Sequence, residues 1–391
     1  MATASHTYMY SQLGYSFLHF TLWSNLLSRC ATIGALHETT VIGTTNTMTD
    51  ERLQPPVQPD KTPLCQHNTN ASQACMQETC KASTQSEPAM QNAWTPLSFK
   101  LALQLAAPHT WPAAIIPFLY GFCVSFRSVD ELSYPAACIM LIIVILFQSA
   151  ANTLNDYFDY KKGADSKTDF VEESDAVLVY HHINPRSVKR LAIAYVVMSF
   201  ILGLYIVYES DIIPLVIGII GALVLVFYSA GKTPLSYLPL GELSSGVVMG
   251  GLIPSAVTYG LTQSYSSAFA LSLIPLILLV ALIMFTNNLS DREKDLSSHR
   301  RTLAGIMSRE QAKTLYVVGV ILTIVAEIFC LESILSADVV VVVAFVLCVA
   351  PFASALIHNP ITPEMRLKSM PQILTFVVIC GVFYCLGCMM Y

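Results

Sequence analysis

From residue 101 onward the chain alternates apolar stretches of about twenty residues with short polar connections. A bilayer core about 30 Å thick needs roughly 20 mostly apolar residues per helix, so each stretch predicts one membrane-spanning helix. The pattern predicts nine of them, at residues 107–126, 134–154, 191–208, 212–229, 242–262, 267–286, 314–332, 337–357 and 371–390. We therefore expect an all-α fold, an integral membrane bundle of nine transmembrane helices.

The fifth stretch, "ELSSGVVMGGLIPSAVTYGL", is unusually rich in Gly, Ser and Pro. Small residues allow helices to approach one another closely in membranes. The composition therefore predicts that this helix lies in the interior of the bundle.

Composition supports the membrane assignment. Hydrophobic residues make up 54% of the chain and charged residues only 12%, where soluble domains average roughly 25% charged residues. The net charge of −5 and the absence of a basic block argue against a nucleic-acid partner. The lipid bilayer is the expected environment.

The distribution of Lys and Arg predicts the orientation in the membrane. The connections after the second, fourth, sixth and eighth stretches hold fifteen of the chain's 21 basic residues, whereas those after the other four hold only Arg127. Basic residues favour the cytoplasmic side of a membrane protein. We expect a multi-pass protein of the cell (inner) membrane with its N-terminus inside and its C-terminus outside.

Residues 38–94 are dominated by Thr, Ser, Gln, Asn and Pro. Such a composition cannot bury enough apolar surface to order the chain. We expect residues 1–95 to form a disordered extension and residues 96–391 to form the transmembrane domain. An alternative is that translation begins at or near Met90, since every predicted span lies after it.

Two acidic segments follow predicted helices on the cytoplasmic side. In "NTLNDYFDYKKGAD" (152–165), Asn152, Asp156 and Asp159 have the spacing i, i+4, i+7, which puts them on one helical face. Asp165 follows after Gly163, where a turn is expected.

The second segment, "NNLSDREKDLSSHRRTLAG" (287–305), repeats the pattern with Asn288, Asp291 and Asp295 at i, i+3, i+7. Charged residues beside a membrane helix are ordinarily solvated, and either segment alone favours that interpretation. Two matched segments on one membrane face instead indicate a shared cation site.

Ligand chemistry identifies the cation. Oxygen ligands with few carboxylates per ion suit Mg²⁺, which takes phosphate oxygens as further ligands. Basic residues accompany both segments, and a Mg²⁺-bridged diphosphate is the simplest ligand that satisfies both charge signs. These residues are Lys161, Lys162, Lys232, Arg300 and Arg301.

At these residues the sequence resembles the UbiA superfamily of intramembrane aromatic prenyltransferases, and most closely its 1,4-dihydroxy-2-naphthoate polyprenyltransferase (MenA) type. The stretch from Asn155 to Asp165 is similar to the first motif of that type, and the stretch from Asn287 to Ala304 is similar to the second. The sequences "YSAGKTPLSYLPLGE" (228–242) and "APHTWPAAIIP" (107–117) are also similar. The resemblance covers residues 100–390.

The resemblance implies a nine-helix fold, a polyprenyl diphosphate donor, an aromatic acceptor and Mg²⁺ as cofactor. It implies that Asp156, Asp159, Asp291 and Asp295 are metal ligands, with Asn152 beside them in catalysis. It further implies that the substrates are bound by Asn155, Lys161, Asp165, Tyr228, Lys232, Asn288, Arg300 and Arg301. The expected reaction is transfer of the polyprenyl group to 1,4-dihydroxy-2-naphthoate in menaquinone biosynthesis, with release of diphosphate and CO₂.

The sequence departs from that type at Ser290, His299 and Lys232, and in the loop after the first segment. These departures leave the acceptor open, and 4-hydroxybenzoate and homogentisate are alternatives. A transporter would place its carboxylates near the membrane midplane, whereas here they lie at one face. A phosphatidyltransferase would carry a D-G-x-x-A-R signature, which is absent.

Three further polar residues stand out. Glu242 is an equal candidate for a site role or a structural one, and His109 is expected to be an interfacial residue. Glu327 is an intramembrane carboxylate near the outer end of its helix, where we expect its side chain to reach the interface.

Overall fold

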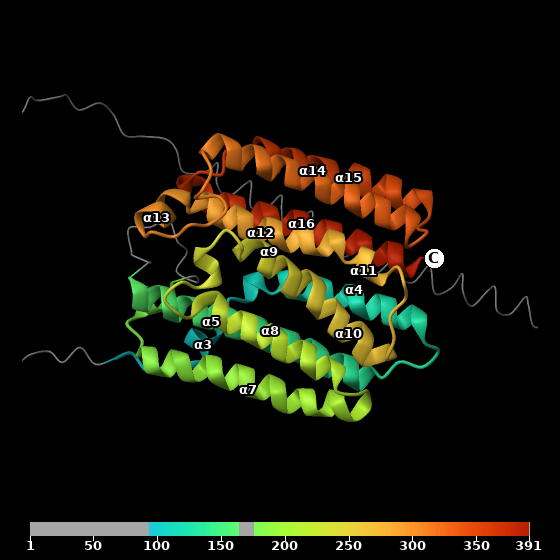
Figure 1. Ribbon diagram of the computed structural model, residues 1–391, viewed down its shortest axis with the longest axis horizontal. Helices are drawn as coiled ribbons and strands as arrows, with labels where there is room; N and C mark the ends of the chain where they lie inside the picture. Colours follow the sequence, from blue (N-terminus) through green and yellow to red (C-terminus); the bar gives the residue numbers. More distant parts are fainter. Residues whose placement is uncertain (1–93, 164–175, 391) are drawn as a thin grey trace, which may run out of the picture. The chain divides into compact units, whose positions relative to one another are not determined.

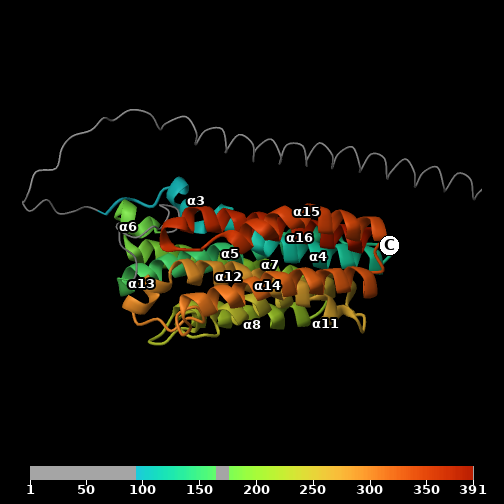
Figure 2. The same ribbon diagram turned by 90° about the horizontal axis from the view of Figure 1, so that it is seen from above.

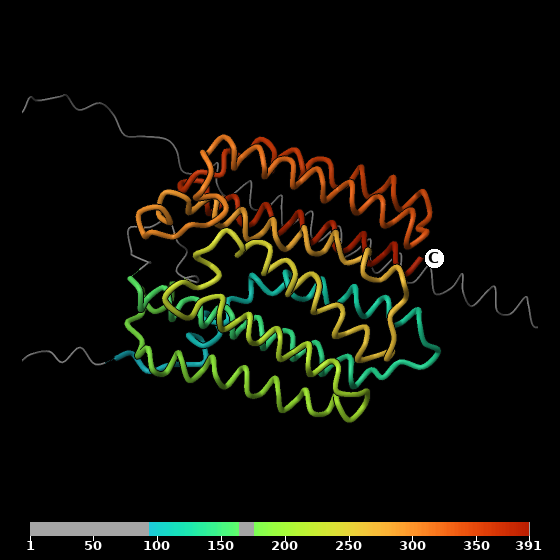
Figure 3. Tube along the Cα trace, viewed as in Figure 1, coloured from blue at the N-terminus to red at the C-terminus, as the bar shows by residue number. Residues whose placement is uncertain are grey.

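The computed structural model describes residues 94–163 and 176–390. Within these ranges the secondary structure is helical, apart from one isolated bridge between Thr95 and Ile183. Figure 1 shows the long helices running side by side along a common axis, and the trace in Figure 3 shows the connections at their ends.

The helices up to residue 262 are α3 (Phe99–Ala106), η1 (Pro108–Thr110), α4 (Pro112–Ser128), α5 (Tyr134–Lys162), α6 (Val177–His181), α7 (Pro185–Glu209), α8 (Ile213–Ser229), η2 (Leu235–Tyr237), α9 (Gly241–Ser245), η3 (Gly246–Leu252) and α10 (Ile253–Thr262). Those that follow are α11 (Phe269–Ser272), α12 (Ile274–Ser290), α13 (Arg292–Ser297), α14 (Arg309–Ser333), α15 (Val339–His358), η4 (Pro363–Met365) and α16 (Arg366–Met389).

The predicted all-α membrane bundle is confirmed. Among the residues that the structure describes, six helical segments are long and apolar enough to cross a membrane: α5, α7, Phe269–Ser290, α14, α15 and Pro363–Met389. Helices α4 and α8 are shorter apolar helices, and the fifth predicted span forms as the consecutive pieces α9, η3 and α10. Each predicted stretch thus coincides with helical structure, and the count of nine spans is consistent with the fold but stays a prediction.

The fifth span lies against α12, as its small residues predict. A Cβ atom on Gly246 would lie 2.6 Å from the carbonyl oxygen of Ile277, and one on Gly250 would overlap the backbone of Leu276. Only glycine permits this approach, because any larger side chain would push the two helices apart. The π-helical segment η3 therefore packs directly on the helix that ends at the second acidic segment.

Two apolar cores lie along the long helices, and a third, smaller one joins α3, α6 and the start of α7. One is formed mainly by α4, α12, α14, α15 and α16, and the other by α4, α5, α7 and α10. Helix α4 contributes to both, through Tyr120 in the first core and Phe118 in the second. The two groups of helices leave a cavity between them, described below.

The ends of α5 and α12 that carry the acidic segments lie at the same end of the bundle. Figure 1 shows α13, which follows α12, at the end opposite the C-terminus, and Figure 2 shows α6 and α13 together at that end. Helix α5 continues beyond residue 154 to Lys162, where Gly163 adopts the left-handed conformation with φ of 67° and ends the helix. The predicted extension of the helix beyond the apolar stretch and the predicted turn at Gly163 are both present.

Glu327 does not reach an interface, so that expectation is wrong. Its side chain is fully buried in α14, and within the described part of the chain neither carboxyl oxygen is hydrogen-bonded to a nitrogen or oxygen atom, with the weakly polar Cys380 thiol as its neighbour. Helices α12, α15 and α16 pack against the face of α14 that carries Glu327, whereas the opposite face is exposed at Ile321 and Val325.

We expect Glu327→Leu to raise the melting temperature by about 2–4 °C, because burial of a carboxyl group with only a thiol beside it is costly and a leucine fills similar volume. Thermal unfolding in detergent measures the effect. Glu332→Leu on the exposed face of the same helix is the control and should change the melting temperature little. A lower melting temperature for Glu327→Leu would mean that the carboxyl group stabilises the bundle.

Candidate active site

A cavity of about 690 Å³ opens between α4, α5, α7, α8, α10, α12 and α16. Polar and charged side chains line the end near the two acidic segments, and apolar side chains line the rest. The acidic segments therefore face one chamber rather than solvent alone.

The first acidic segment lines this cavity with Asn152, Asn155, Asp156 and Asp159. The predicted common face of Asn152, Asp156 and Asp159 is thus present. Asn155 lies on the same wall: its Nδ2 donates to Asp159 Oδ2 at 3.0 Å, and its Oδ1 accepts from Ser229 Oγ at 3.4 Å. This amide links the end of α5 to the end of α8.

Asn152 holds the chain that leads into the first span. Its Nδ2 donates to Thr110 Oγ1 at 2.8 Å and to the Ala106 carbonyl oxygen at 2.9 Å, and Gln148 donates to its Oδ1 at 3.5 Å. His109, Thr110 and Gln148 also line the cavity. His109 is exposed, in keeping with the interfacial interpretation, and also lines the cavity, which that interpretation did not anticipate.

Asp156 is hydrogen-bonded to the backbone at the start of α6. Asp156 accepts the backbone N–H of Val177 at 2.9 Å and that of Leu178 at 3.5 Å, so it also anchors the start of α6. Asp165 lies outside the described residues, and its predicted role stays a prediction.

In the second segment, Asp291 lines the cavity at the point where α12 ends. Arg366, at the start of α16, donates from Nη1 to Asp291 Oδ2 at 2.7 Å and is itself buried. Asn288 also lines the cavity, and its Nδ2 donates to Glu242 Oε1 at 2.8 Å. Glu242 does not line the cavity, so its contact orients Asn288 from behind.

Asp295 lies behind the wall of the cavity rather than on it. Its side chain is 1% exposed and forms an ion pair with Arg300 Nη1 at 3.4 Å, while Thr302 Oγ1 donates to it at 3.4 Å. Burial raises the pKa of Asp295 to about 7, with the Arg300 guanidinium opposing the shift. Lys294, one residue earlier on α13, lines the cavity instead.

The cavity contains three cationic side chains, Lys294, Arg300 and Arg366. Burial opposes the charge of Arg300, but the carboxylates of Asp295 and Asp159 outweigh it and raise the pKa of the guanidinium. The Arg300 guanidinium also stacks 4.8 Å from the centre of the Tyr237 ring. Arg300 thus lies between the two acidic segments.

The structure separates the basic residues that the sequence grouped together. Lys161, Lys232 and Arg301 are exposed and are not among the residues that line the cavity, whereas Tyr228 lines it. Lys294 and Arg366 line it without having been predicted. The position of Lys294, three residues after Asp291, could have predicted its place at the site. Arg366 lies too far from both acidic segments in the sequence for residue spacing to predict its place there.

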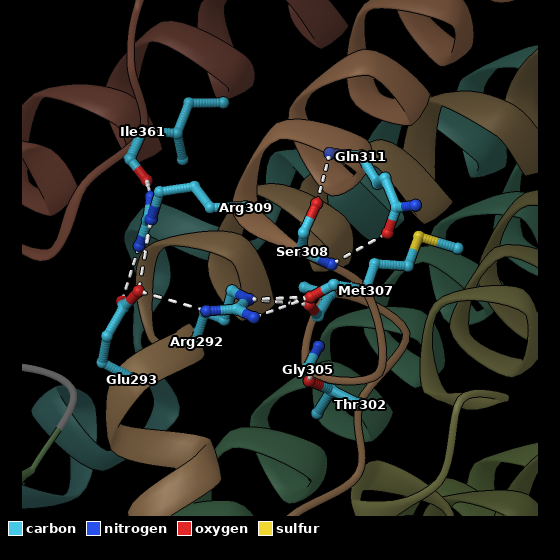
Figure 4. A network of polar contacts seen from close by, with 10 residues as sticks. Arg292, Glu293, Thr302, Gly305, Met307, Ser308, Arg309, Gln311 and Ile361 are labelled. Carbon is cyan, nitrogen blue, oxygen red and sulfur yellow. Dashed lines mark hydrogen bonds and ion pairs between the residues drawn. The ribbon is translucent and has the colours of Figure 1, made fainter.

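The loop that carries Arg300 is held by a polar network (Figure 4). Arg292 donates to the carbonyl oxygens of Ala304 and Met307, at 3.1 and 2.7 Å. Arg309 pairs with Glu293 and donates to the Ile361 carbonyl oxygen at 2.9 Å. These contacts fix the connection between α13 and α14 and so the position of Arg300 at the cavity.

The donor set fits a divalent cation held together with a substrate. Among the described residues, no three His, Cys, Asp or Glu side chains gather closely enough to hold a metal ion by themselves. Mg²⁺ seldom uses such a cage; it binds one or two carboxylates and completes its shell with water and phosphate oxygens. Asp156, Asp159 and Asp291 provide carboxylates from two sides of the cavity, which suits this mode.

The fold and cavity define a polytopic helical membrane protein with a charged chamber at one end of an apolar cavity. The sequence pattern of the UbiA prenyltransferase family matches residues 114–388. The chain therefore belongs to the UbiA prenyltransferase family and is a prenyltransferase enzyme.

Individual relatives agree with this assignment. The chain is 33% identical over 232 residues to 1,4-dihydroxy-2-naphthoate octaprenyltransferase of Bacillus subtilis, covering 56% of this chain and 73% of the relative. It is 29% identical over 215 residues to the Haemophilus influenzae protein of the same name, covering 52% and 68%. The structure of a UbiA homolog from Archaeoglobus fulgidus bound to GPP and Mg²⁺ has the same fold, with a TM-score of 0.53 at 14% identity over 73% of this chain and 99% of that one.

Proposed function

We propose that the protein transfers a polyprenyl group from a polyprenyl diphosphate to an aromatic quinone precursor in a Mg²⁺-dependent reaction. One observation carries the proposal: two acidic segments, distant in sequence, meet with three cationic side chains at the charged end of a single apolar cavity. A diphosphate needs the charged end, and a polyprenyl chain needs the apolar part. A soluble acidic substrate would need no apolar cavity of this size.

In this proposal Asp156, Asp159, Asp291 and Asp295 are the metal ligands, with Asp295 reaching the ion only after its contact with Arg300 adjusts. Bound Mg²⁺ would neutralise the diphosphate and make it a better leaving group. The diphosphate itself would be bound by Arg300, Lys294 and Arg366, whose charges are fixed in place before the reaction.

The reaction balances without a further reactant. The bond between C1 of the prenyl group and the diphosphate oxygen breaks, and diphosphate leaves with the electron pair. A ring carbon of the acceptor then bonds to C1, and the acceptor carboxylate leaves as CO₂. One carboxylate anion and one prenyl diphosphate thus give a neutral prenylated diol, CO₂ and diphosphate.

The chain's own residues protect the reacting carbon. Tyr228 lies in the cavity wall on α8 and presents an aromatic side chain beside the charged chamber. Aromatic faces stabilise a positive charge that develops nearby, and the apolar walls exclude water that would otherwise hydrolyse the donor.

For the acceptor we propose 1,4-dihydroxy-2-naphthoate, which places the enzyme in menaquinone biosynthesis. The names of the Bacillus subtilis and Haemophilus influenzae relatives support this choice. The Archaeoglobus fulgidus homolog bound to GPP and Mg²⁺ supports the donor class and the cation. A different acceptor, such as 4-hydroxybenzoate or homogentisate, is the alternative.

We also propose that the protein lies in the inner membrane with both acidic segments on the cytoplasmic side, the N-terminus inside and the C-terminus outside. The excess of Lys and Arg in the connections after the second, fourth, sixth and eighth predicted spans supports this orientation. Water-soluble acceptor would then reach the charged chamber directly from the cytoplasm.

Membranes containing the protein, supplied with Mg²⁺, farnesyl diphosphate and 1,4-dihydroxy-2-naphthoate, are expected to yield a prenylated, decarboxylated product by mass spectrometry. EDTA should abolish the product, and added Mg²⁺ should restore it, because the metal neutralises the leaving group. A panel with 4-hydroxybenzoate and homogentisate identifies the acceptor. Absence of product with every acceptor would refute the proposed reaction.

A further inference from the structure

One aromatic ring, that of Tyr237, contacts a cation from each acidic segment. The Nζ atom of Lys162, at the end of α5, lies 4.4 Å from the centre of the ring, and the guanidinium carbon of Arg300 lies 4.8 Å from it. Tyr237 is the last residue of η2, in the connection between α8 and α9, and does not line the cavity. The ring therefore reaches the charged chamber only through the cations that it contacts.

Backbone contacts fix the position of Tyr237. Its carbonyl oxygen accepts the N–H of Arg301 at 2.9 Å, so the loop that carries Arg300 is joined to η2 through the main chain as well as through the ring. The N–H of Tyr237 donates to the Pro234 carbonyl oxygen at 2.9 Å. A substitution of the side chain keeps both hydrogen bonds, because neither of them uses the ring.

Lys162 is held on the other side of this contact. Its Nζ donates to the Ser229 carbonyl oxygen at 2.9 Å, at the end of α8, where the helix dipole favours a cation. Asp159 attracts the Lys162 ammonium group, and Arg300 repels it. The face of an aromatic ring attracts cations. The ring of Tyr237 therefore offsets the repulsion between Lys162 and Arg300, because it attracts both.

The Arg300 guanidinium has few other contacts that orient it. Its Nη1 pairs with Asp295 at 3.4 Å, and its buried Nε has no hydrogen-bond partner among the residues that the structure describes. One long ion pair leaves the side chain free to rotate, whereas stacking on a ring restricts the plane of a guanidinium. The contact with Tyr237 thus orients the cation that lines the cavity.

We propose that Tyr237 is a positioning residue for prenyl transfer: its ring holds the Arg300 guanidinium at the chamber and joins it to Lys162. This inference rests on the proposed function, because it takes the diphosphate to bind at Arg300. A preorganised cation stabilises charge most strongly where that charge develops in the transition state. Loss of the ring therefore lowers kcat more than it raises the KM for the donor.

Replacement of the ring by an alkyl side chain tests the proposal. Tyr237→Leu should lower kcat about tenfold and change the KM for farnesyl diphosphate less than about threefold, whereas Tyr237→Phe keeps the ring and should retain kcat within about threefold. Phe158→Leu is the matched control, because the Phe158 ring contacts the Lys162 ammonium group, at 5.6 Å, rather than Arg300. It should also retain kcat within about threefold.

A double variant distinguishes positioning from a general structural role. Tyr237→Leu combined with Arg300→Met should be no slower than Arg300→Met alone, since the ring acts through a guanidinium that is already absent. If the two residues acted independently, the double variant would be slower by a further factor of about ten.

The electron density of the ring gives a second test, which applies even if Tyr237→Leu does not accumulate. Fluorine withdraws density from an aromatic face and changes its shape little. With 4-fluoro-, 3,5-difluoro- and 3,4,5-trifluorophenylalanine at position 237, kcat should fall about twofold per fluorine relative to Tyr237→Phe. The hydroxyl group is absent throughout this series, so the trend reports the attraction between ring and cation.

Inorganic diphosphate with Mg²⁺ gives a readout that needs no turnover, since it carries the charge that develops on the leaving group. It should raise the melting temperature of the Tyr237→Phe protein at least twice as much as that of the trifluorophenylalanine variant. In an active enzyme, a flat fluorinated series or independent losses in the double variant would overturn the positioning role and leave the proposed reaction intact. If the wild-type enzyme made no product with any acceptor, the reaction would be refuted, and equal stabilisation of these two variants by diphosphate would overturn the positioning role as well.

Discussion

Asp291→Asn is expected to lower prenyl transfer by about a thousandfold or more. Asn keeps the shape of the side chain but removes the charge that would hold the divalent cation at the cavity wall. It also leaves Arg366 without its ion-pair partner, at 2.7 Å in the native protein. Loss of a single charge-stabilising group in an active site costs about a hundred- to a thousandfold in kcat, and loss of the cation adds to it.

Initial rates at saturating Mg²⁺, measured in membranes with matched protein amounts, give the effect. Asp211→Asn is the control, because Asp211 is also a hydrogen-bonded carboxylate, accepting from Tyr259 at 3.0 Å, but does not line the cavity. It should retain activity within about threefold, as surface substitutions away from a site usually do. If Asp291→Asn kept more than a tenth of wild-type activity, Asp291 would not be a metal ligand.

The second large effect is expected at Arg300. Arg300→Met should lower kcat by about a hundredfold or more, because the guanidinium lines the cavity and interacts with a carboxylate of each acidic segment, Asp159 and Asp295. The same change removes the ion pair of the buried Asp295 carboxyl group, so a lower melting temperature should accompany the loss at a pH above 7, where the native carboxyl group is charged.

Arg301→Met is the matched control, one residue later on the same loop. The Arg301 side chain is exposed, and its hydrogen bond to the Tyr237 carbonyl oxygen at 2.9 Å comes from the backbone, which the substitution preserves. We expect activity within about threefold of wild type. Equal losses for the two variants would mean that the loop binds substrate through general charge rather than through the position of Arg300.

Local spacing predicted the first acidic segment well. Asn152, Asp156 and Asp159 lie on one face because α5 continues without a break to Lys162, so the helical period applies throughout. The second segment followed the pattern only in part. The helix breaks at Asp291, which adopts φ of −92° and ψ of 8°, and α13 starts anew. The break turns Asp295 toward Arg300 and presents Lys294 to the cavity.

The charge of a residue beside the acidic segments did not predict whether its side chain lines the cavity. Lys161 and Arg301 were grouped with Arg300 because all three lie beside acidic residues in sequence, yet only Arg300 lines the cavity. The sign of a charge does not say which way a side chain at a helix end points. Arg366 was missed because it joins the site only through the packing of α16 on α12 and α4.

The sequence by itself determined the class of protein and predicted the chemistry of its site. Long apolar stretches require helices in a bilayer, because every backbone N–H and C=O must be satisfied without water, and paired oxygen-rich segments favour Mg²⁺ with a diphosphate. Tertiary structure alone decided that α16 brings Arg366 to Asp291 and that Asp295 lies behind the wall of the cavity. These features depend on contacts between helices far apart in the chain, which no local period encodes.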